Sequence, residues 1–477
     1  MRLAGSAGQW VAAAGWAVTA CGGSAVPSPG PSVAPRGPVV TAAAGAKLAR
    51  GAGRCTYRVG VTAREPWRVK VHARCEGTRT TAFALSEPAS AAFVTTPLTA
   101  SRPAPGVAEL DYSVDLDGLA RDADDFDVAR LFGKSLVAPA SSFLLTPAPP
   151  EDGVPIRVVL EDSAMETGLR QSGDAFVIES HELRVATYTT FGARQTRDLP
   201  VGSATLRLAV LDGALDLGVD ELARWVTEAA TGVATFFHRP PEARTLVVLA
   251  PLPNRHGVAF GKLLPESGPG VIVLIGEHTT AAELRDDWVL VHELFHVGTP
   301  SYQGEGKWYD EGLATYFEPL IRTRMGWRSE SATWHEFLRE MPRGVPAMTE
   351  RGLEHPEGYS DVYWGGAVFC LLADVAERRS TGGARGLEDG VRAVLEAGGV
   401  ASEVWSLARA TDMTDRALGS SLFSALASAH AEHGTPVELD ELFRALGVRL
   451  DARDQIVFDD RAPLAGVRQA LIHGAPP

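Results

Sequence analysis

Residues 51–200 alternate apolar and polar positions in short runs, separated by turns that contain Pro or Gly. A period of two is typical of β-strands that bury one face, and this spacing of short strands predicts a β-sandwich. The predicted strands are Tyr57–Thr62, Val69–Ala73, Thr81–Leu85, Leu110–Val114, Ile156–Leu160, Phe176–Ile178 and Leu183–Thr190.

From residue 201 the pattern becomes mixed. The continuous apolar runs Ala204–Leu211, Leu246–Ala250 and Val271–Ile275 have the length of buried strands. Over Val219–Phe237 apolar residues recur every three or four positions, which predicts an amphipathic helix. Thr280–Val297 is predicted as the next helix, with Thr279 or Thr280 as its N-cap and Glu283 in its first turn.

These elements describe a multidomain α+β protein with three folded bodies. They are a β-sandwich at 51–200, an α+β domain at 201–327 and an α-helical domain at 328–477, in which helical segments alternate with Gly and Pro breaks. A leader at 1–21 and a flexible linker at 22–50 precede them. The linker is rich in Pro, Ala and Gly and cannot bury a core.

The leader has the features of an export signal. Arg2 is followed by the apolar stretch Trp10–Val18 and by small residues before Cys21. The ending Val-Thr-Ala-Cys resembles a bacterial lipobox, which implies acylation of Cys21 and stable anchoring by several acyl chains. The resemblance predicts an exported cell-envelope lipoprotein at the outer membrane or cell surface, attached to the membrane only by its lipid. An ordinary signal peptide with a chance Cys is the alternative.

Composition and charge exclude several other classes. The 477 residues are 45% hydrophobic and 22% charged, as in ordinary globular proteins, and the formal net charge is −14. Nucleic-acid binding needs a basic face, so this balance argues against a nucleic-acid partner. No stretch reaches 18 uninterrupted apolar residues, so no transmembrane helix is expected.

The remaining cysteines fit an exported protein. Cys55 and Cys75 flank two predicted strands with a turn near Glu65-Pro66, and an antiparallel pair would bring them together. In an oxidising compartment they are predicted to form a disulfide. Cys370 lies in an apolar run and is expected to be an inert core thiol.

The candidate chemistry lies on the predicted helix at 280–297. His292 and His296 are four residues apart and therefore share one helix face, where two imidazoles can bind one Zn²⁺. Glu293 beside them can reach a water molecule on that metal. The alternative is a helix whose two His residues merely cover a polar face. Downstream, Glu311 can complete a site of two His and one Glu, which leaves a coordination position open for catalysis.

These residues carry a family resemblance. HExxH followed by W-x-x-E-G-x-A-x-Y-x-E over residues 288–318 resembles the gluzincin metallopeptidases, in particular the leukotriene A4 hydrolase and aminopeptidase families and the glycyl aminopeptidases. The resemblance implies a thermolysin-like catalytic domain, one Zn²⁺ per chain and a peptide or protein substrate. It matches His292, His296 and Glu311 to the metal ligands and Glu293 to the general base.

Three further residues near this motif are candidates for the site. Tyr363, in Tyr-Trp-Gly-Gly, resembles the tyrosine that stabilises the oxyanion in the related peptidases, and Tyr359 is the other candidate. The alternative for Tyr363 is a structural core tyrosine. Glu318 lies two helical turns after Glu311 and is expected either to orient a ligand His or to be a solvated carboxylate.

One segment departs from the aminopeptidase pattern. The related exopeptidases carry a Gly-x-Met-Glu-Asn strand whose Glu binds the substrate amine, whereas His256–Gly261 here has no Glu. The segment can still form an edge strand that pairs with a peptide backbone.

The sequence therefore predicts a zinc metallopeptidase that is aminopeptidase-like but not assigned to exo- or endo-cleavage. The alternative from another class is a catalytically inactive lipoprotein that keeps the gluzincin fold as a binding scaffold. A serine hydrolase is disfavoured because no G-x-S-x-G elbow is present.

Overall fold

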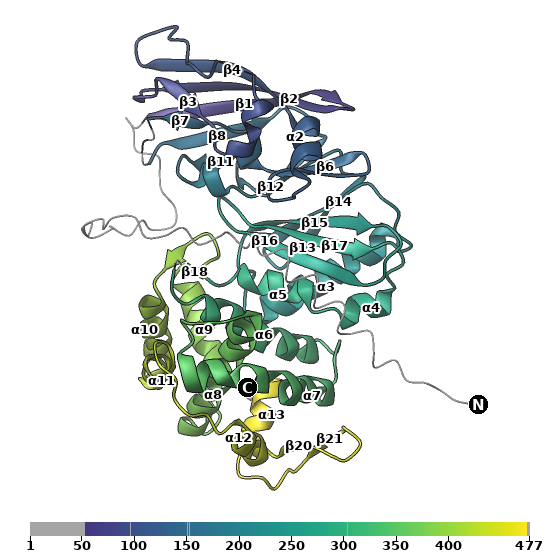
Figure 1. The fold of residues 1–477 in the computed structure, drawn as a ribbon, viewed down its shortest axis with the longest axis vertical. Helices are drawn as coiled ribbons and strands as arrows, with labels where there is room; N and C mark the ends of the chain where they lie inside the picture. Colours follow the sequence, from purple (N-terminus) through teal and green to yellow (C-terminus); the bar gives the residue numbers. More distant parts are fainter. Residues whose placement is uncertain (1–52, 96, 150, 152, 303, 475–477) are drawn as a thin grey trace. The chain divides into compact units, whose positions relative to one another are not determined.

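The computed structural model describes residues 53–95, 97–149, 151, 153–302 and 304–474 (Figure 1). The predictions for the leader at 1–21, for Cys21 and for the linker at 22–50 lie outside these residues. No helix in these ranges is both long and apolar enough to cross a membrane.

The N-terminal body contains two main sheets and a two-stranded ladder of β3 and β7. One sheet has the order β10-β11-β8-β1-β2-β4 and the other the order β5-β6-β12-β9. Their elements are β1 (Arg54–Arg64), β2 (Trp67–Glu76), β3 (Ala82–Ala84), β4 (Val107–Asp115), α2 (Leu116–Ala123), β5 (Arg130–Phe132), β6 (Ser135–Pro139), β7 (Thr146–Ala148), β8 (Pro155–Leu160), β9 (Met165–Thr167), β10 (Arg170–Ser172), β11 (Ala175–Glu179) and β12 (Tyr188–Phe191). Both sheets contribute to one buried cluster, with Tyr57 and Val69 from the first and Leu136 and Phe191 from the second.

Strands β1 and β2 form the antiparallel pair that the sequence pattern predicts. Cys55 lies directly opposite Cys75, with their Cα atoms 4.0 Å apart, and the two form a disulfide. Cys370 is buried and free, and its burial raises the pKa of its thiol, which suits an inert core residue.

The prediction of one strand over Leu183–Thr190 is wrong in its first half. Glu182–Val185 forms a short 3₁₀ turn, and only Tyr188–Phe191 is extended. The Glu182 carboxylate accepts a hydrogen bond from the backbone N–H of Glu179 (2.8 Å) and closes the chain into this turn. Such local side-chain bonds compete with strand pairing.

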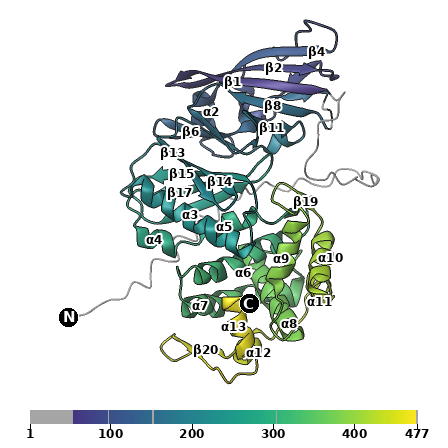
Figure 2. The same ribbon diagram turned by 180° about the vertical axis from the view of Figure 1, so that it is seen from behind.

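The central sheet has five strands in the order β13-β14-β15-β17-β16, with β16 at one edge. The strands are β13 (Gln195–Val201), β14 (Ala204–Val210), β15 (Arg244–Leu252), β16 (Val258–Leu264) and β17 (Gly270–Gly276). Because β13 pairs with β14, this sheet begins at residue 195. The sequence pattern places residues 195–200 in the preceding β-sandwich. Helices α3 (Val219–Phe236) and α5 (Val289–His296) cover one face (Figure 1; Figure 2 from the opposite side).

The single helix predicted over Thr280–Val297 is two helices. The helix α4 (Ala281–Asp286) ends at Asp287, whose backbone is extended, and α5 follows. The Asp287 carboxylate accepts hydrogen bonds from the N–H groups of Val289 (2.9 Å) and Leu290 (3.4 Å). This bonding satisfies N–H groups in the first turn of α5, so α5 begins as a separate helix.

The rest of the chain is mainly helical, as its pattern predicts. Its elements are β18 (Ser301–Tyr302), α6 (Lys307–Arg324), α7 (Glu330–Glu340), α8 (Gly366–Ser380), α9 (Leu387–Glu396), β19 (Val404–Trp405), α10 (Leu407–Leu418), α11 (Leu422–His430), α12 (Leu439–Leu446), β20 (Val448–Leu450), β21 (Ile456–Phe458) and α13 (Ala465–His473). One continuous buried cluster runs from Leu199 to Ile472. The central sheet and the C-terminal helices therefore share a hydrophobic core.

Candidate metal centre and active site

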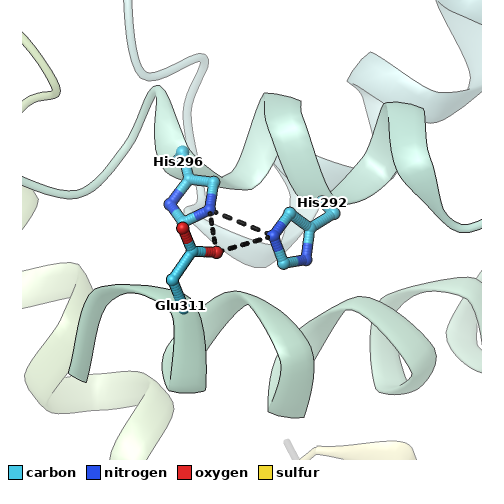
Figure 3. A group of neighbouring side chains, drawn as sticks. All are labelled: His292, His296 and Glu311. Carbon is cyan, nitrogen blue, oxygen red and sulfur yellow. Dashed lines mark hydrogen bonds and ion pairs between the residues drawn. The ribbon is translucent and has the colours of Figure 1, made fainter. Parts of the chain in front are cut away.

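The three side chains predicted to bind metal come from two helices that pack against each other. His292 and His296 lie one turn apart on α5, and Glu311 lies in the second turn of α6. Figure 3 shows all three directed toward one point between the helices. The apolar residues of α5, among them Leu294 and Phe295, are buried in the core, which turns the His face toward α6.

The separations of the ligating atoms suit a metal ion. The Nε2 atoms of His292 and His296 are 3.1 Å apart, and the Oε2 atom of Glu311 lies 3.2 Å and 3.4 Å from them. Zinc bonds of about 2.0–2.1 Å in a tetrahedron place neighbouring ligand atoms about 3.3 Å apart. The side chains of His292, His296 and Glu311 are 4%, 11% and 15% exposed, so the cluster is shielded but not closed. The residues present therefore fit Zn²⁺ with one open position.

The charges around the cluster favour a cation. Burial alone would lower the pKa of His296, but the carboxylates of Asp310 and Glu311 raise it well above its ordinary value. Burial opposes ionisation of Glu311, yet its hydrogen bonds with His292 and His296 hold its pKa well below the ordinary value. The same negative field that would keep a proton on His296 can hold a divalent ion at this position.

Asp310 belongs to the candidate site, although the sequence analysis did not assign it. Its Oδ1 atom lies 3.0 Å from Nδ1 of His296 and 3.4 Å from the hydroxyl of Thr299. A carboxylate at Nδ1 keeps the proton on that nitrogen and leaves the Nε2 lone pair free for a metal. In the sequence, Asp310 could have been noticed because it directly precedes the predicted ligand Glu311. Its contact with His296, however, depends on how α5 and α6 cross.

Glu293 lies on α5 against the edge strand β16. A Cβ atom on Gly261 of β16 would overlap the side chain of Val289 and lie 3.0 Å from Cγ of Glu293, so the glycine permits this close approach. Burial is the largest cause that raises the pKa of Glu293, and the charge of Glu311 adds to it. The histidines and a backbone hydrogen bond with Leu263 lower it in part.

Tyr363 lies beside the cluster. It belongs to a π-helical turn, Asp361–Gly365, that leads into α8, and its ring stacks on His292 with 5.9 Å between centroids. A π turn is a frequent feature of functional sites. The ring of Tyr359 contacts the ring of Tyr363, with 6.3 Å between centroids.

A contact between two glycines brings the Tyr363 segment to α6. A Cβ atom on Gly312 would overlap the backbone of Gly366, and one on Gly366 would overlap the carbonyl of Trp308. The glycine directly after Glu311 and the second glycine after Trp364 are therefore needed for the close crossing of α6 and α8. This contact gives a structural reason for Gly312 in the HExxH-linked motif and for Gly366 in the Tyr-Trp-Gly-Gly segment.

The prediction that Glu318 orients a ligand histidine is not what the structure shows. Glu318 is buried and pairs with Arg322 on the next turn of α6, at 2.8 Å. Arg322 also donates to the backbone carbonyl of Asp286, at 2.6 Å. Through Arg322, Glu318 supports the junction before α5, and its burial also contradicts the alternative of a solvated carboxylate. Asp310 makes the contact to His296.

Glu354 is a second residue that the sequence analysis missed. Its carboxylate accepts hydrogen bonds from the backbone N–H of Gly306 (2.9 Å) and from the indole N–H of Trp308 (2.7 Å). It thereby places a negative charge at the start of α6, where the helix dipole favours one. Glu354 is five residues before Tyr359, so it also links the tyrosine segment to the helix that carries Glu311.

Comparison with known proteins gives matches in structure only. No family model and no curated protein matches the sequence. A crystal structure of an aminopeptidase N family protein from Idiomarina loihiensis is similar, with a TM-score of 0.62 and 14% identity over 83% of this chain and 79% of that chain. This likeness shows a shared fold.

Two further crystal structures are more distant. An M1 zinc metallopeptidase from Deinococcus radiodurans has a TM-score of 0.47 and 13% identity, over 81% of this chain and 94% of that chain. A variant of a two-domain M1 zinc metallopeptidase bound to L-arginine has a TM-score of 0.48 and 12% identity, over the same shares.

Removal of the Asp310 carboxylate is expected to weaken metal binding. We predict that Asp310→Ala lowers zinc affinity about 10- to 100-fold, because His296 loses the partner that orients its ring. Asp310→Asn keeps an acceptor oxygen and should lose less. Competition with a chelator of known affinity measures both. The control is Asp412→Ala on α10, which removes an exposed carboxylate that pairs with Arg416. Equal affinities for wild type and Asp310→Ala would contradict the assigned role.

Proposed function

We propose that this chain is a zinc-dependent metallopeptidase that hydrolyses peptide bonds. The observation that carries the proposal is the convergence of two imidazole Nε2 atoms and one carboxylate oxygen within 3.1–3.4 Å, with Glu293 on the same helix. The shared fold with an aminopeptidase N family protein supports it. The donor set of two His and one Glu is that of catalytic zinc sites, which keep one position open.

The residues of the chain divide the chemical roles between them. His292, His296 and Glu311 would hold Zn²⁺, which when bound supplies a Lewis acid that polarises the scissile carbonyl and acidifies water. Glu293 accepts the proton of the attacking water and passes it to the leaving amine. Its raised pKa suits this work, because a base with a pKa nearer to neutrality also returns the proton readily. Tyr363 donates its hydroxyl proton in a hydrogen bond to the oxygen that becomes negative.

The edge strand β16 offers the place for the substrate backbone. Among the strands that the structure describes, β16 pairs only with β17, and its Gly261 and Leu263 adjoin Glu293. A peptide laid along this edge can use main-chain hydrogen bonds. Strand β16 contains no carboxylate, and its Phe260 packs on Phe126 at 5.3 Å between ring centroids. A peptide amine therefore finds no acidic partner on this strand.

The test compares four proteins, each treated with zinc in the same way. Wild type is expected to cleave members of a broad peptide pool, and Glu293→Gln should keep its zinc and lose about 10²- to 10⁴-fold in rate, as removal of a general base does. His296→Ala should lose both zinc and activity. Glu305→Gln, at an exposed acid near α6, is the control and should cleave like wild type. Mass spectrometry of the pool and metal analysis of each protein give the readouts.

The outcomes separate the candidate functions. Cleavage that needs Glu293 supports the peptidase, and comparison of acetylated with free N-termini then assigns endo- or aminopeptidase action. If wild type binds zinc but cleaves no peptide, the peptidase proposal is refuted and the alternative, a binding scaffold, is favoured. If wild type contains no zinc after reconstitution, the assignment of a metal centre is refuted.

We further propose that the chain is exported and held at the cell envelope by acylation of Cys21. The leader sequence and the disulfide between Cys55 and Cys75 support this, because disulfides persist in oxidising compartments. Expression in a bacterial host with labelled palmitate is expected to label wild type and not Cys21→Ser. Equal labelling of both, or none of either, would refute the anchor.

A further inference from the structure

Two histidines lie side by side at the open end of the hairpin that β16 and β17 form. The strands are antiparallel and are joined at one end by residues 265–269, while Val258 pairs with Ile275 at the other end. His256 lies two residues before β16, and His278 lies two residues after β17. Their ring centroids are 5.6 Å apart. The hairpin therefore brings together two imidazoles from separate parts of the chain.

Backbone contacts hold the two segments that carry these histidines. The N–H of His278 donates to the carbonyl of Arg255 (2.8 Å), and the N–H of Gly276 donates to the carbonyl of Gly257 (2.9 Å). A Cβ atom on Gly276 would overlap the backbone of Arg255, so the segments approach closely. Gly257 has a φ of 69°, a left-handed conformation that glycine adopts without strain. The backbone thus places the two rings near each other, whatever their side chains contact.

A carboxylate lies beside the Nδ1 atom of each ring. Oδ2 of Asp216 is 3.0 Å from Nδ1 of His278, and Oε1 of Glu283 is 3.5 Å from Nδ1 of His256. The other oxygen of Glu283 accepts from the backbone N–H of Thr280 (2.7 Å), which fixes this carboxylate at the start of α4. A carboxylate at Nδ1 keeps a proton on that nitrogen and leaves the Nε2 lone pair for a metal.

This arrangement repeats features of the candidate metal centre. There, Asp310 lies beside Nδ1 of His296, and the ring centroids of His292 and His296 are 4.8 Å apart. Metal–nitrogen bonds of about 2.0–2.1 Å, at an angle of about 110–120°, place the centroids of two bound rings about 5–6 Å apart. The separation of 5.6 Å at the hairpin lies in this range.

We propose that His256 and His278 form a second metal site, which binds one divalent ion of the copper or nickel class through the two Nε2 atoms. The rings are 64% and 40% exposed, so water completes the shell of the ion. Two imidazoles and water oxygens form the nitrogen and oxygen donor set that suits Cu²⁺ and Ni²⁺, and Cu²⁺ binds most tightly among the first-row divalent ions. The site offers two protein ligands, one fewer than the candidate catalytic centre, so it holds Zn²⁺ only weakly.

A metal ion at this site closes the open end of the hairpin. It links the segment before β16 to the segment after β17, and β16 is the edge strand of the central sheet. The ion therefore stabilises an edge strand that in its absence is held along one side only, among the strands that the structure describes. The site is independent of the proposed peptidase function, because it uses none of the residues assigned to the catalytic centre.

The test adds Cu²⁺ to the full chain after its zinc has been loaded and counted. Electron paramagnetic resonance is expected to show one Cu²⁺ bound by two nitrogens, while the zinc content stays unchanged. Competition with a chelator gives the affinity, which His256→Ala and His278→Ala should each lower more than about tenfold, since each removes one of two protein ligands. His296→Ala, which lacks the other centre, should keep this copper site.

His181→Ala is the matched control. His181 is 66% exposed and lies 3.4 Å from Glu179, so it shares the carboxylate at Nδ1 but belongs to another sheet region, near β11. Its removal should leave the copper affinity unchanged. An affinity that falls equally in His181→Ala and His278→Ala would show adventitious binding to surface histidines and overturn the site. A copper signal with one nitrogen, or one that survives both His256→Ala and His278→Ala, overturns it as well.

Hydrogen exchange tests the effect on the edge strand. Copper is expected to slow amide exchange in Val258–Leu264 of wild type and to have no such effect in His278→Ala, because an ion that binds the closed hairpin opposes its opening. Copper bound by both histidines without slower exchange in this strand would refute the clip. None of these readouts needs peptide cleavage, so the copper site and the peptidase function can fail separately.

Discussion

The structure depends on one geometric requirement: two helices must hold three ligating atoms within 3.1–3.4 Å of one another. Such a cluster of lone pairs repels itself unless a cation or protons lie between them, so packing elsewhere must hold the helices in place. The helix α5 is only eight residues long and cannot fix its own position. Its apolar residues lie in the core shared by the central sheet and the C-terminal helices, and this burial sets its rotation.

Three polar or steric contacts then position α6 and the elements that pack against it. Arg322 reaches from α6 to the backbone just before α5, and Glu318 supports it from within the core. Glu354 satisfies donors at the start of α6, close to Glu311. The contact between Gly312 and Gly366 brings α8, and with it the tyrosine segment, against the same helix. Each contact places one part of the site, and none of them touches the ligating atoms.

The local parts of this arrangement could be predicted from the sequence. The HExxH spacing places two histidines on one helix face, and the strand pattern brings Cys55 opposite Cys75, since both depend on short-range periodicity. What could not be predicted depends on how separate elements cross. Asp310 meets His296 only because α6 crosses α5 at that point, and the break at Asp287 arises because its side chain bonds backbone groups that a continuous helix would use. The seven-residue spacing from Glu311 predicts either a contact of Glu318 with a histidine or a solvated carboxylate. Glu318 instead is buried and pairs with Arg322, which also contacts the backbone just before α5.

We propose that His292, His296 and Glu311 bind one zinc ion in an open site. X-ray absorption at the zinc edge of the reconstituted full chain tests this site most directly. The expected zinc shell contains two imidazole nitrogens, one carboxylate oxygen and one further light atom, all at about 2.0–2.2 Å. A sulfur ligand at about 2.3 Å, or a six-coordinate shell of oxygens without imidazole, would contradict it.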